Sequence, residues 1–480
     1  MDYFQFFLFA THLLFVTQLG WYLITNLQWY DYKISRVILK HHKVSWHLIY
    51  FVVPFFAYHL TGEFFWIFFY FAVVPGFLLW NKKLDKRLVI TWRVKRFLAL
   101  LLGLAIFGDI LCTMKDACTT YAVFLPLFLA GLGSFLIEKF LFVAFKKEAK
   151  AKIERMHNMK IVAITGSYGK TSMKNFIVEL LSTKYKVYAT PGNVNTLGGI
   201  IKDINTSLPN DTEIYVVEAG ARERGDIYAI AQLVNPHAIV VGKVGPQHIE
   251  YFKTLDNIIL TKMELMHSNR LERAFIHESV TDEPHDKVSF FGQDISHVES
   301  HLDGLSFELM VNKDKYAFET KVLGAFQAIN IEAAVLMADY FRVSMDTIVE
   351  KVKNLNVVPH RLEKIIAGGK IILDDSYNGN YDGVNEAINL ASEYEGRKII
   401  VTPGLVESTE EFNTDIAKRI DEVFDVAIIT GSLNAELYDS LIHNAYKIML
   451  KNKSHMEQIL ANTTQEGDLI LFANDAPNFI

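Results

Sequence analysis

The fold is decided by one stretch, Ile161-Val162-Ala163-Ile164-Thr165-Gly166-Ser167-Tyr168-Gly169-Lys170-Thr171-Ser172. Apolar residues lead into a loop bracketed by two glycines, and the residues that follow, up to Leu181, can form a helix. This order predicts a strand, a phosphate-binding loop and a helix N-terminus, where backbone N–H groups and the helix dipole bind phosphate oxygens. We expect Lys170 to reach the terminal phosphates and the Thr171 hydroxyl to hold Mg²⁺.

The glycine spacing of this loop is Gly-x-x-Gly-Lys-Thr, two residues tighter than the common Gly-x-x-x-x-Gly-Lys-Thr form. A Gly-Lys-Thr triplet also occurs by chance in ordinary loops. The apolar run before the triplet and the helix-forming segment after it favour a phosphate loop.

The composition is uneven along the chain. Apolar residues make up 51% of the 480 residues and are concentrated in the first 145 positions. The net charge of −6 argues against nucleic acid as a partner of the whole chain. The two cysteines, Cys112 and Cys118, lie in or beside the apolar region, and they predict neither a disulfide framework nor a zinc site.

We interpret residues 1–150 as a transmembrane helical region of about five spans, because apolar runs cover about 4–25, 47–60, 64–80, 97–112 and 121–137. Crossing a bilayer takes about 20 apolar residues. The short second and third runs therefore form either two tilted spans or a re-entrant hairpin that turns at Thr61-Gly62-Glu63. A buried helical domain of a soluble protein is the alternative, and the tryptophans near the run ends disfavour it.

Basic residues follow the first, third and fifth runs, whereas the other connections carry almost no net positive charge. Positively charged loops face the cytoplasm. Five crossings with the N-terminus outside satisfy every loop, and three crossings with a re-entrant hairpin satisfy them equally. Both arrangements place residues 146–480 in the cytoplasm.

Residues 155–356 alternate strands and helices, which predicts a parallel α/β sheet. One strand delivers Glu218 at its carboxyl end, where such folds place a Mg²⁺ ligand. His248 follows the next strand, and Lys262 lies on the helix after it. The simpler alternatives are a solvated acid for Glu218, a loop cap for His248 and a surface lysine for Lys262.

Residues 357–480 read as a second, smaller α/β unit with a Rossmann-like alternation of strands and helices. The predicted fold class is thus an N-terminal transmembrane α-helical region followed by two α/β domains, a central ATP-binding domain with the phosphate loop and a Rossmann-like C-terminal domain.

From residue 159 to about 400 the sequence resembles the Mur ligase family, ATP-dependent amide-bond ligases of peptidoglycan precursor synthesis. The resemblance is carried by Thr165 to Ser172, Glu218-Ala219-Gly220-Ala221, His248, Lys262, Asn330, Pro359-His360-Arg361 and Asp374-Asp375-Ser376-Tyr377-Asn378. Within the family, Pro191-Gly192-Asn193-Val194-Asn195 and Asp375 to Asn380 are most similar to the ligases that add D-alanyl-D-alanine to UDP-N-acetylmuramoyl-tripeptide.

The resemblance implies ATP and Mg²⁺ as cofactors, with Lys170, His248 and Lys262 as catalytic residues. The ATP phosphates would be cradled by Gly166, Ser167, Tyr168, Gly169, Lys170, Thr171 and Ser172. Thr171 and Glu218 would hold one Mg²⁺, and His248 and a carbamylated Lys262 would hold a second. Asn330 would touch the adenine side, and Arg361 and Asp375 would reach the phosphates and the ribose.

The implied reaction activates a substrate carboxylate as an acyl phosphate, which the amine of D-alanyl-D-alanine then attacks. Such chemistry needs positioning and charge neutralisation rather than a protein nucleophile. The expected partners are the UDP-muramoyl peptide, D-alanyl-D-alanine, the lipid bilayer and membrane-bound cell-wall enzymes, and the expected location is the bacterial inner membrane.

Three features depart from the family pattern: membrane segments replace the soluble N-terminal domain that holds the uridine end, Phe326 replaces a histidine, and Asn474-Asp475-Ala476-Pro477 replaces Lys-Gly-Ser. Two alternatives are a related membrane-bound ligase such as a polyglutamate synthase, and a non-catalytic nucleotide switch that gates the membrane helices. A switch does not need two metal sites, so Glu218, His248 and Lys262 argue against it.

Overall fold

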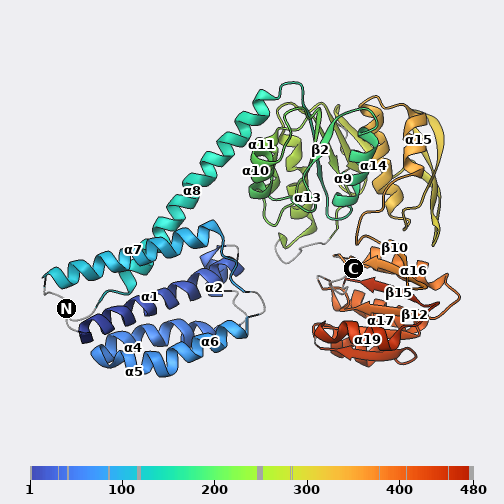
Figure 1. The fold of residues 1–480 in the computed structure, drawn as a ribbon. Helices are drawn as coiled ribbons and strands as arrows, with labels where there is room; N and C mark the ends of the chain where they lie inside the picture. The colour runs from blue at the N-terminus through green and yellow to red at the C-terminus, as the bar shows by residue number, and fades with distance from the viewer. Residues whose placement is uncertain are drawn as a thin grey trace. The chain divides into compact units, whose positions relative to one another are not determined.

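The chain divides into two compact units, Met1–Ala144 and Phe145–Ile480. The computed structural model describes residues 3–30, 32–39, 43–84, 87–115, 121–245, 252–281, 283, 285–377, 379–406, 408–451 and 453–474. The first unit is helical, and the second contains the β-sheets (Figure 1).

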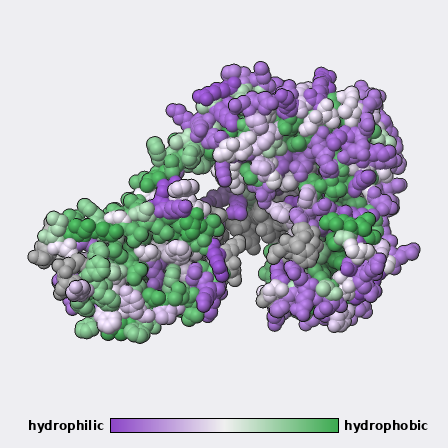
Figure 2. All heavy atoms as spheres, in the orientation of Figure 1, coloured by the Kyte–Doolittle hydropathy of each residue, from purple (hydrophilic) through white to green (hydrophobic). Residues whose placement is uncertain are grey.

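The helical unit is built from α1 (Tyr3–Trp29), α2 (Ile34–Leu39), a segmented helix from Ser45 to Lys82, α7 (Trp92–Lys115) and the first part of α8 (Phe124–Arg155). Within the described residues, four helical segments are long and apolar enough to cross a membrane: Tyr3–Trp29, Ser45–Lys82, Trp92–Met114 and Phe124–Arg155. Apolar residues also cover much of the visible surface of this unit (Figure 2).

The segment Ser45–Lys82 is a hairpin. Its first arm ends with α4 (Val53–Thr61), where Gly62 adopts a positive φ of 53° that ends the helix. The second arm contains α5 (Phe65–Phe68) and α6 (Val74–Lys82). Ring centroids of Tyr58 and Phe65 lie 5.0 Å apart beside the turn, and those of Trp46 and Trp80 lie 6.4 Å apart at the far ends. The two arms are therefore antiparallel, and the predicted turn at Thr61-Gly62-Glu63 is confirmed.

Helix α1 lies at the core of the helical unit. Its side chains Phe15, Val16 and Leu19 are fully buried there. At Gly20 an added Cβ would lie 2.2 Å from Cδ2 of Leu101, so the glycine permits the close approach of α1 and α7. Cys112 on α7 is disulfide-bonded, which the sequence analysis did not predict because two cysteines make no framework.

The second unit begins with a parallel sheet in the order β2-β3-β1-β4-β5-β6. Its strands are β1 (Lys160–Thr165), β2 (Val187–Ala189), β3 (Ile214–Glu218), β4 (Ala238–Val241), β5 (Arg273–His277) and β6 (Val288–Phe291). Helices α9 (Lys170–Leu181), α14 (Gln327–Tyr340) and α15 (Met345–Lys353) contribute to the core on one face. The other face packs against α10 (Leu197–Thr206), α11 (Asp226–Val234) and α13 (Leu255–Met263). The predicted parallel α/β sheet is confirmed.

A small antiparallel sheet of β7 (Ile295–His301), β8 (Gly304–Val311) and β9 (Asp314–Thr320) follows. Its apolar side contributes Leu305, Phe307 and Phe318 to the core that contains α14. The sequence pattern from 273 to 318, short strands with polar turns, agrees with this sheet.

The last sheet has the order β10-β11-β15-β12-β13-β14, all parallel except the β10–β11 hairpin. The strands are β10 (Glu363–Ala367), β11 (Lys370–Asp375), β12 (Lys398–Thr402), β13 (Val426–Thr430), β14 (Tyr446–Leu450) and β15 (Leu469–Ala473). They alternate with α16 (Tyr381–Ser392), α17 (Glu410–Val423), α18 (Ala435–Leu441) and α19 (Met456–Thr463). The sequence pattern predicts strands at 370–373, 397–401, 426–430 and 468–473, which correspond to β11, β12, β13 and β15, but it does not predict β10 or β14.

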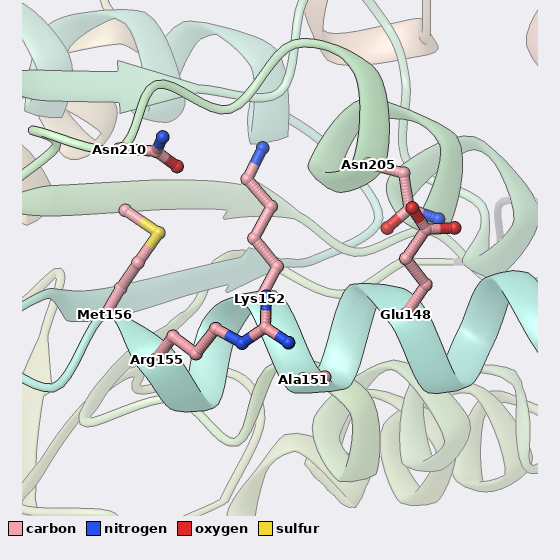
Figure 3. A pocket seen from close by; sticks show the side chains of 7 residues that line it. All are labelled: Glu148, Ala151, Lys152, Arg155, Met156, Asn205 and Asn210. Carbon is pink, nitrogen blue, oxygen red and sulfur yellow. The ribbon is translucent and has the colours of Figure 1, made fainter.

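The last turns of α8 belong to the second unit. Ala149 and Ile153 are buried in the core beneath α10, and the Lys152 ammonium donates to the carbonyl oxygens of Ile204 and Leu208 at 2.8 and 2.7 Å. A cavity of about 520 Å³, lined among others by Glu148, Arg155 and Asn210, lies beside this contact (Figure 3).

The close approach of α1 and α7 predicts a matched pair of glycine variants. Gly20→Val places side-chain atoms against the buried Leu101 and should lower stability by about 1–3 kcal/mol, as overpacking of a filled core does. Gly103→Val adds the same atoms on α7 where no neighbour lies within 4 Å, and its effect should be small. Thermal unfolding of the full chain in detergent measures both, and equal losses would contradict this packing.

Candidate active site

The phosphate loop joins β1 to α9, as predicted. Gly169 adopts a left-handed φ of 72° at the N-cap of α9, a conformation that glycine adopts without strain. The Lys170 ammonium donates to the carbonyl oxygens of Gly166 and Ser167, both at 2.9 Å. Burial lowers the pKa of Lys170 to about 8, although the nearby Glu218 carboxylate acts to raise it. The lysine is thus a half-buried cation at the end of the loop, with two carbonyl oxygens as its partners.

The loop is anchored on the segment after β4. The backbone N–H groups of Ser167 and Tyr168 donate to the carbonyl oxygen of Lys243. The Ser167 hydroxyl donates to the carbonyl oxygen of Gly245 at 3.0 Å, and a Cβ at Gly245 would lie 2.5 Å from the Tyr168 ring. Ser167 and Tyr168 therefore hold the loop against the segment after β4 through both their backbone N–H groups and their side chains.

Glu218 lies at the carboxyl end of β3, beside β1, and is 1% exposed. Its Oε2 accepts hydrogen bonds from the Thr171 hydroxyl at 3.0 Å and faces the Lys174 ammonium at 3.2 Å. Its Oε1 accepts from the Asn195 amide at 3.0 Å. The alternative of a solvated acid is wrong, and the structure brings Thr171 and Glu218 together as predicted.

These two oxygen donors fit a magnesium ion. Mg²⁺ takes one or two protein oxygens together with phosphate oxygens and waters, and Thr171 and Glu218 supply that set beside the phosphate loop. Within the described residues, no group of three or more His, Cys, Asp or Glu side chains could hold a metal ion. Phosphate oxygens would therefore complete the coordination.

Lys262 on α13 is buried, with 4% of its surface exposed, so the alternative of a surface lysine is wrong. Burial, with Lys170 as a second cause, lowers its pKa to about 7. A large fraction of this amine is neutral at neutral pH, and the neutral form is the nucleophile that combines with CO₂. His248, its predicted partner in the second metal site, lies outside the described residues.

Asn330 is placed by α14 against the phosphate loop. Its Oδ1 lies 2.2 Å from the position that a Cβ on Gly169 would take, so only glycine fits at that loop position. The Asn330 amide donates to Oε1 of the buried Gln327 at 2.7 Å. The contact of Asn330 with adenine stays a prediction.

Ser172, which was expected to help cradle the phosphates, is buried within α9.

Arg361 and Asp375 come from the C-terminal part of the chain. Arg361 donates to the carbonyl oxygen of Tyr377 at 2.7 Å and lies 4.5 Å over the Tyr377 ring. Burial lowers the pKa of Arg361, whereas Asp375, Tyr377 and Glu218 act to raise it, so the guanidinium lies within electrostatic range of the Glu218 carboxylate. Burial also raises the pKa of Asp375 to about 7, against the opposing effect of Arg361.

Polar contacts join the C-terminal part to the segments around the phosphate loop. Asn193 donates to the Tyr377 hydroxyl, and Lys243 pairs with Asp382 at 2.8 Å. The connection between the two parts has positive φ at His360 (62°) and Leu362 (53°), an uncommon conformation for such residues.

Sequence reasoning assigned no role to Lys174, Asn195 or Tyr377. Asn195 and Tyr377 belong to the quoted motifs, so the motif itself was the available signal. Lys174 lies one turn after Lys170 on the same helix, and helical spacing could have placed it near the loop.

The arrangement can neutralise and orient phosphate groups. Lys170 and Arg361 supply positive charge, Thr171 and Glu218 supply metal ligands, and the loop supplies backbone N–H groups. No serine or cysteine nucleophile is needed for this chemistry.

The chain matches two family profiles, the Mur ligase middle domain over residues 164–338 and the Mur ligase glutamate ligase domain over residues 360–474. The UDP-N-acetylmuramoyl-tripeptide–D-alanyl-D-alanine ligase of Bacillus subtilis is 27% identical over 353 residues, covering 68% of this chain and 76% of that protein. The MurF ligase of Thermotoga maritima, solved in complex with ADP, superposes with a TM-score of 0.59 at 25% identity, covering 69% of this chain and 80% of that chain. A MurF structure from Acinetobacter baumannii, at 21% identity, shares the fold with a TM-score of 0.61 over 70% of this chain and 77% of its own. The two profiles together cover more than half of the sequence, and the chain belongs to the Mur ligase family.

Proposed function

We propose that this protein is an ATP-dependent ligase that adds D-alanyl-D-alanine to UDP-N-acetylmuramoyl-tripeptide in peptidoglycan precursor synthesis. The observation that carries the proposal is the meeting of Lys170 and the Thr171–Glu218 pair at one phosphate loop. Curated relatives named for this reaction support the substrate assignment.

The reaction begins when the terminal carboxylate of the tripeptide attacks the γ-phosphorus of ATP. The P–O bond to ADP breaks, and an acyl phosphate forms on the substrate. Lys170 and Arg361 offset the negative charge that gathers on the transferred phosphoryl group, and the loop N–H groups fix its position. Mg²⁺ held by Thr171 and Glu218 would add charge neutralisation at the phosphates.

The amine of D-alanyl-D-alanine then attacks the acyl carbon. The new C–N bond forms, inorganic phosphate leaves, and the amine proton passes to solvent. The chain's contribution to this step is to keep the acyl phosphate beside the acceptor and away from water.

Lys262 is proposed to carry a carbamate. Its neutral amine bonds to the carbon of CO₂ and releases one proton, which turns a buried neutral amine into a carboxylate-like anion. Such an anion is a hard oxygen ligand suited to Mg²⁺. With His248 it would form the second metal site.

We further propose that the first unit anchors the ligase in the bacterial inner membrane, with the ligase unit in the cytoplasm. Four apolar helical segments support the anchor, and the basic connections of the sequence support the orientation.

The deciding experiment measures phosphate release by the detergent-solubilised full chain with Mg·ATP and UDP-muramoyl tripeptide, with and without D-alanyl-D-alanine. Release that depends on the dipeptide, with the pentapeptide product seen by mass spectrometry, is expected. Glutamate incorporation in its place would indicate a polyglutamate synthase, and ATP binding without release would indicate a switch.

Lys170→Ala should lower turnover by at least about 100-fold, because the charge on the transferred phosphoryl group loses a preorganised partner. Lys186→Ala is the matched control, since Lys186 forms an exposed pair with Asp211 and should keep full turnover. Comparable turnover of the two variants would remove Lys170 from the mechanism.

Lys262→Ala should lose activity, and small carboxylates such as formate or acetate should restore part of it. The added carboxylate can occupy the space left by the shortened side chain and replace the carbamate oxygens. Lys170→Ala is the control, because no carboxylate can replace a cation. The carbamate assignment fails if the Lys262→Ala variant responds to carboxylates no better than the Lys170→Ala variant.

The hairpin turn gives a test of the number of crossings. In a background with Cys112→Ser and Cys118→Ser, we expect Glu63→Cys to react with an impermeant maleimide added to spheroplasts, as Tyr3→Cys should. Lys150→Cys should react only after detergent is added. Protection of the Glu63→Cys variant together with labelling of the Tyr3→Cys variant would instead indicate a re-entrant hairpin and three crossings.

A further inference from the structure

Lys174 is a buried lysine beside the candidate magnesium site. It lies on α9, one turn after Lys170, and is 1% exposed. Its ammonium lies 3.2 Å from Oε2 of Glu218 and donates to the carbonyl oxygen of Gly192. A buried cation is costly unless it is paired and hydrogen-bonded, so these two contacts are what hold the charge at this position.

The first of these two contacts of Lys174 fixes the carboxylate of Glu218. Oε2 faces both the Thr171 hydroxyl and the Lys174 ammonium, and Oε1 faces the Asn195 amide. Partners of this kind set the orientation of a carboxylate that binds a metal. Lys174 is the one partner of the three that carries a charge, so it also offsets the negative charge of Glu218.

The second contact of Lys174, with the Gly192 carbonyl oxygen, fixes the loop over residues 190–196, which connects β2 to α10. Gly192 has a left-handed φ of 52°, and its carbonyl is the one that Lys174 binds. Further contacts tie the same loop to the end of β3, because the Glu218 N–H donates to the Thr190 hydroxyl at 3.1 Å. The loop is therefore fastened to the metal-binding carboxylate by more than one bond.

The same loop receives the C-terminal part of the chain. Asn193, next to Gly192, donates to the Tyr377 hydroxyl, and the Arg361 guanidinium lies over the Tyr377 ring. A continuous set of contacts thus runs from Glu218 through Lys174 and the loop to Arg361, the cation that the C-terminal part brings to the phosphates.

We propose that Lys174 is a positioning residue of the ligase reaction, which holds the Glu218 carboxylate and the 190–196 loop in fixed relation. This inference rests on the proposed function. Lys174 fixes the position of the metal ligand Glu218 and of the 190–196 loop, to which Tyr377 binds through Asn193. Metal binding and the placement of Arg361 therefore both depend on one buried ammonium.

The first test compares Lys174→Met with Lys186→Met in the full chain in detergent. Methionine keeps the length of the side chain and removes its charge. The Mg²⁺ concentration that gives half-maximal binding of ADP, measured by calorimetry, should rise about 10–100-fold in Lys174→Met, as for other residues that orient metal ligands. Lys186→Met should match the unaltered protein. An unchanged Mg²⁺ requirement in a folded Lys174→Met variant would overturn the proposal.

The second test asks whether Lys174 acts through the loop. Tyr377→Phe removes only the hydroxyl that Asn193 binds, and the double variant completes a cycle for ADP affinity at saturating Mg²⁺. Coupled residues give non-additive changes, so the double variant should lose less than the sum of the single losses. Additive losses would overturn the claim that Lys174 acts on Tyr377 through the 190–196 loop.

Thermal unfolding accompanies both tests, because a merely structural lysine would lower stability and leave the Mg²⁺ requirement unchanged. If Lys174→Met does not fold, Lys174→Gln keeps a donor for Gly192 without the charge, and its Mg²⁺ requirement should still rise. Both readouts use ADP and Mg²⁺ alone. A failure to ligate D-alanyl-D-alanine would therefore refute the proposed substrates without changing the result for Lys174.

Discussion

The buried carboxylate of Glu218 is the interaction on which the rest of the ligase unit depends. It lies where β3 ends beside β1, in register with Ile164 just before the phosphate loop. Hydrogen bonds and one ion pair bring Thr171, Lys174 and Asn195 to its two oxygens. A buried charge with these partners is stable only while all of them stay in place. One carboxylate therefore fixes the positions of both α9 and the 190–196 loop.

Partial or full burial also separates the two other lysines of the site from ordinary surface lysines. Lys170 is half-buried and donates to carbonyl oxygens of its own loop, and Lys262 is a buried residue of α13. In both cases burial lowers the pKa. The physical consequence differs, since the Lys170 ammonium has two carbonyl partners, whereas the pKa of Lys262 falls to about 7.

The sequence predicted those parts of the fold that local pattern determines. The apolar run before Gly166 and the glycine-rich loop identified β1 and the phosphate loop, and the strand before Glu218 placed the carboxylate correctly. The missed elements depend on distant partners. β10 is held by its pairing with β11, and Lys174 is defined by a carbonyl from a loop 18 residues away. Neither leaves a local pattern, because burial of a lysine is decided by the tertiary structure.

The apolar helical unit shows the same division between local and tertiary information. Apolar runs and basic connections predicted helices and their order, and Gly62 marked the turn. What the runs did not indicate is the role of the end of α8, where Ala149 and Ile153 complete the core of the ligase unit. Lys152 there binds the carbonyl oxygens of Ile204, within α10, and Leu208, just after it. Removing α8 with the other apolar helices would expose that core and remove the Lys152 donor from those carbonyl groups. The helix that leads out of the apolar region is therefore part of the ligase fold.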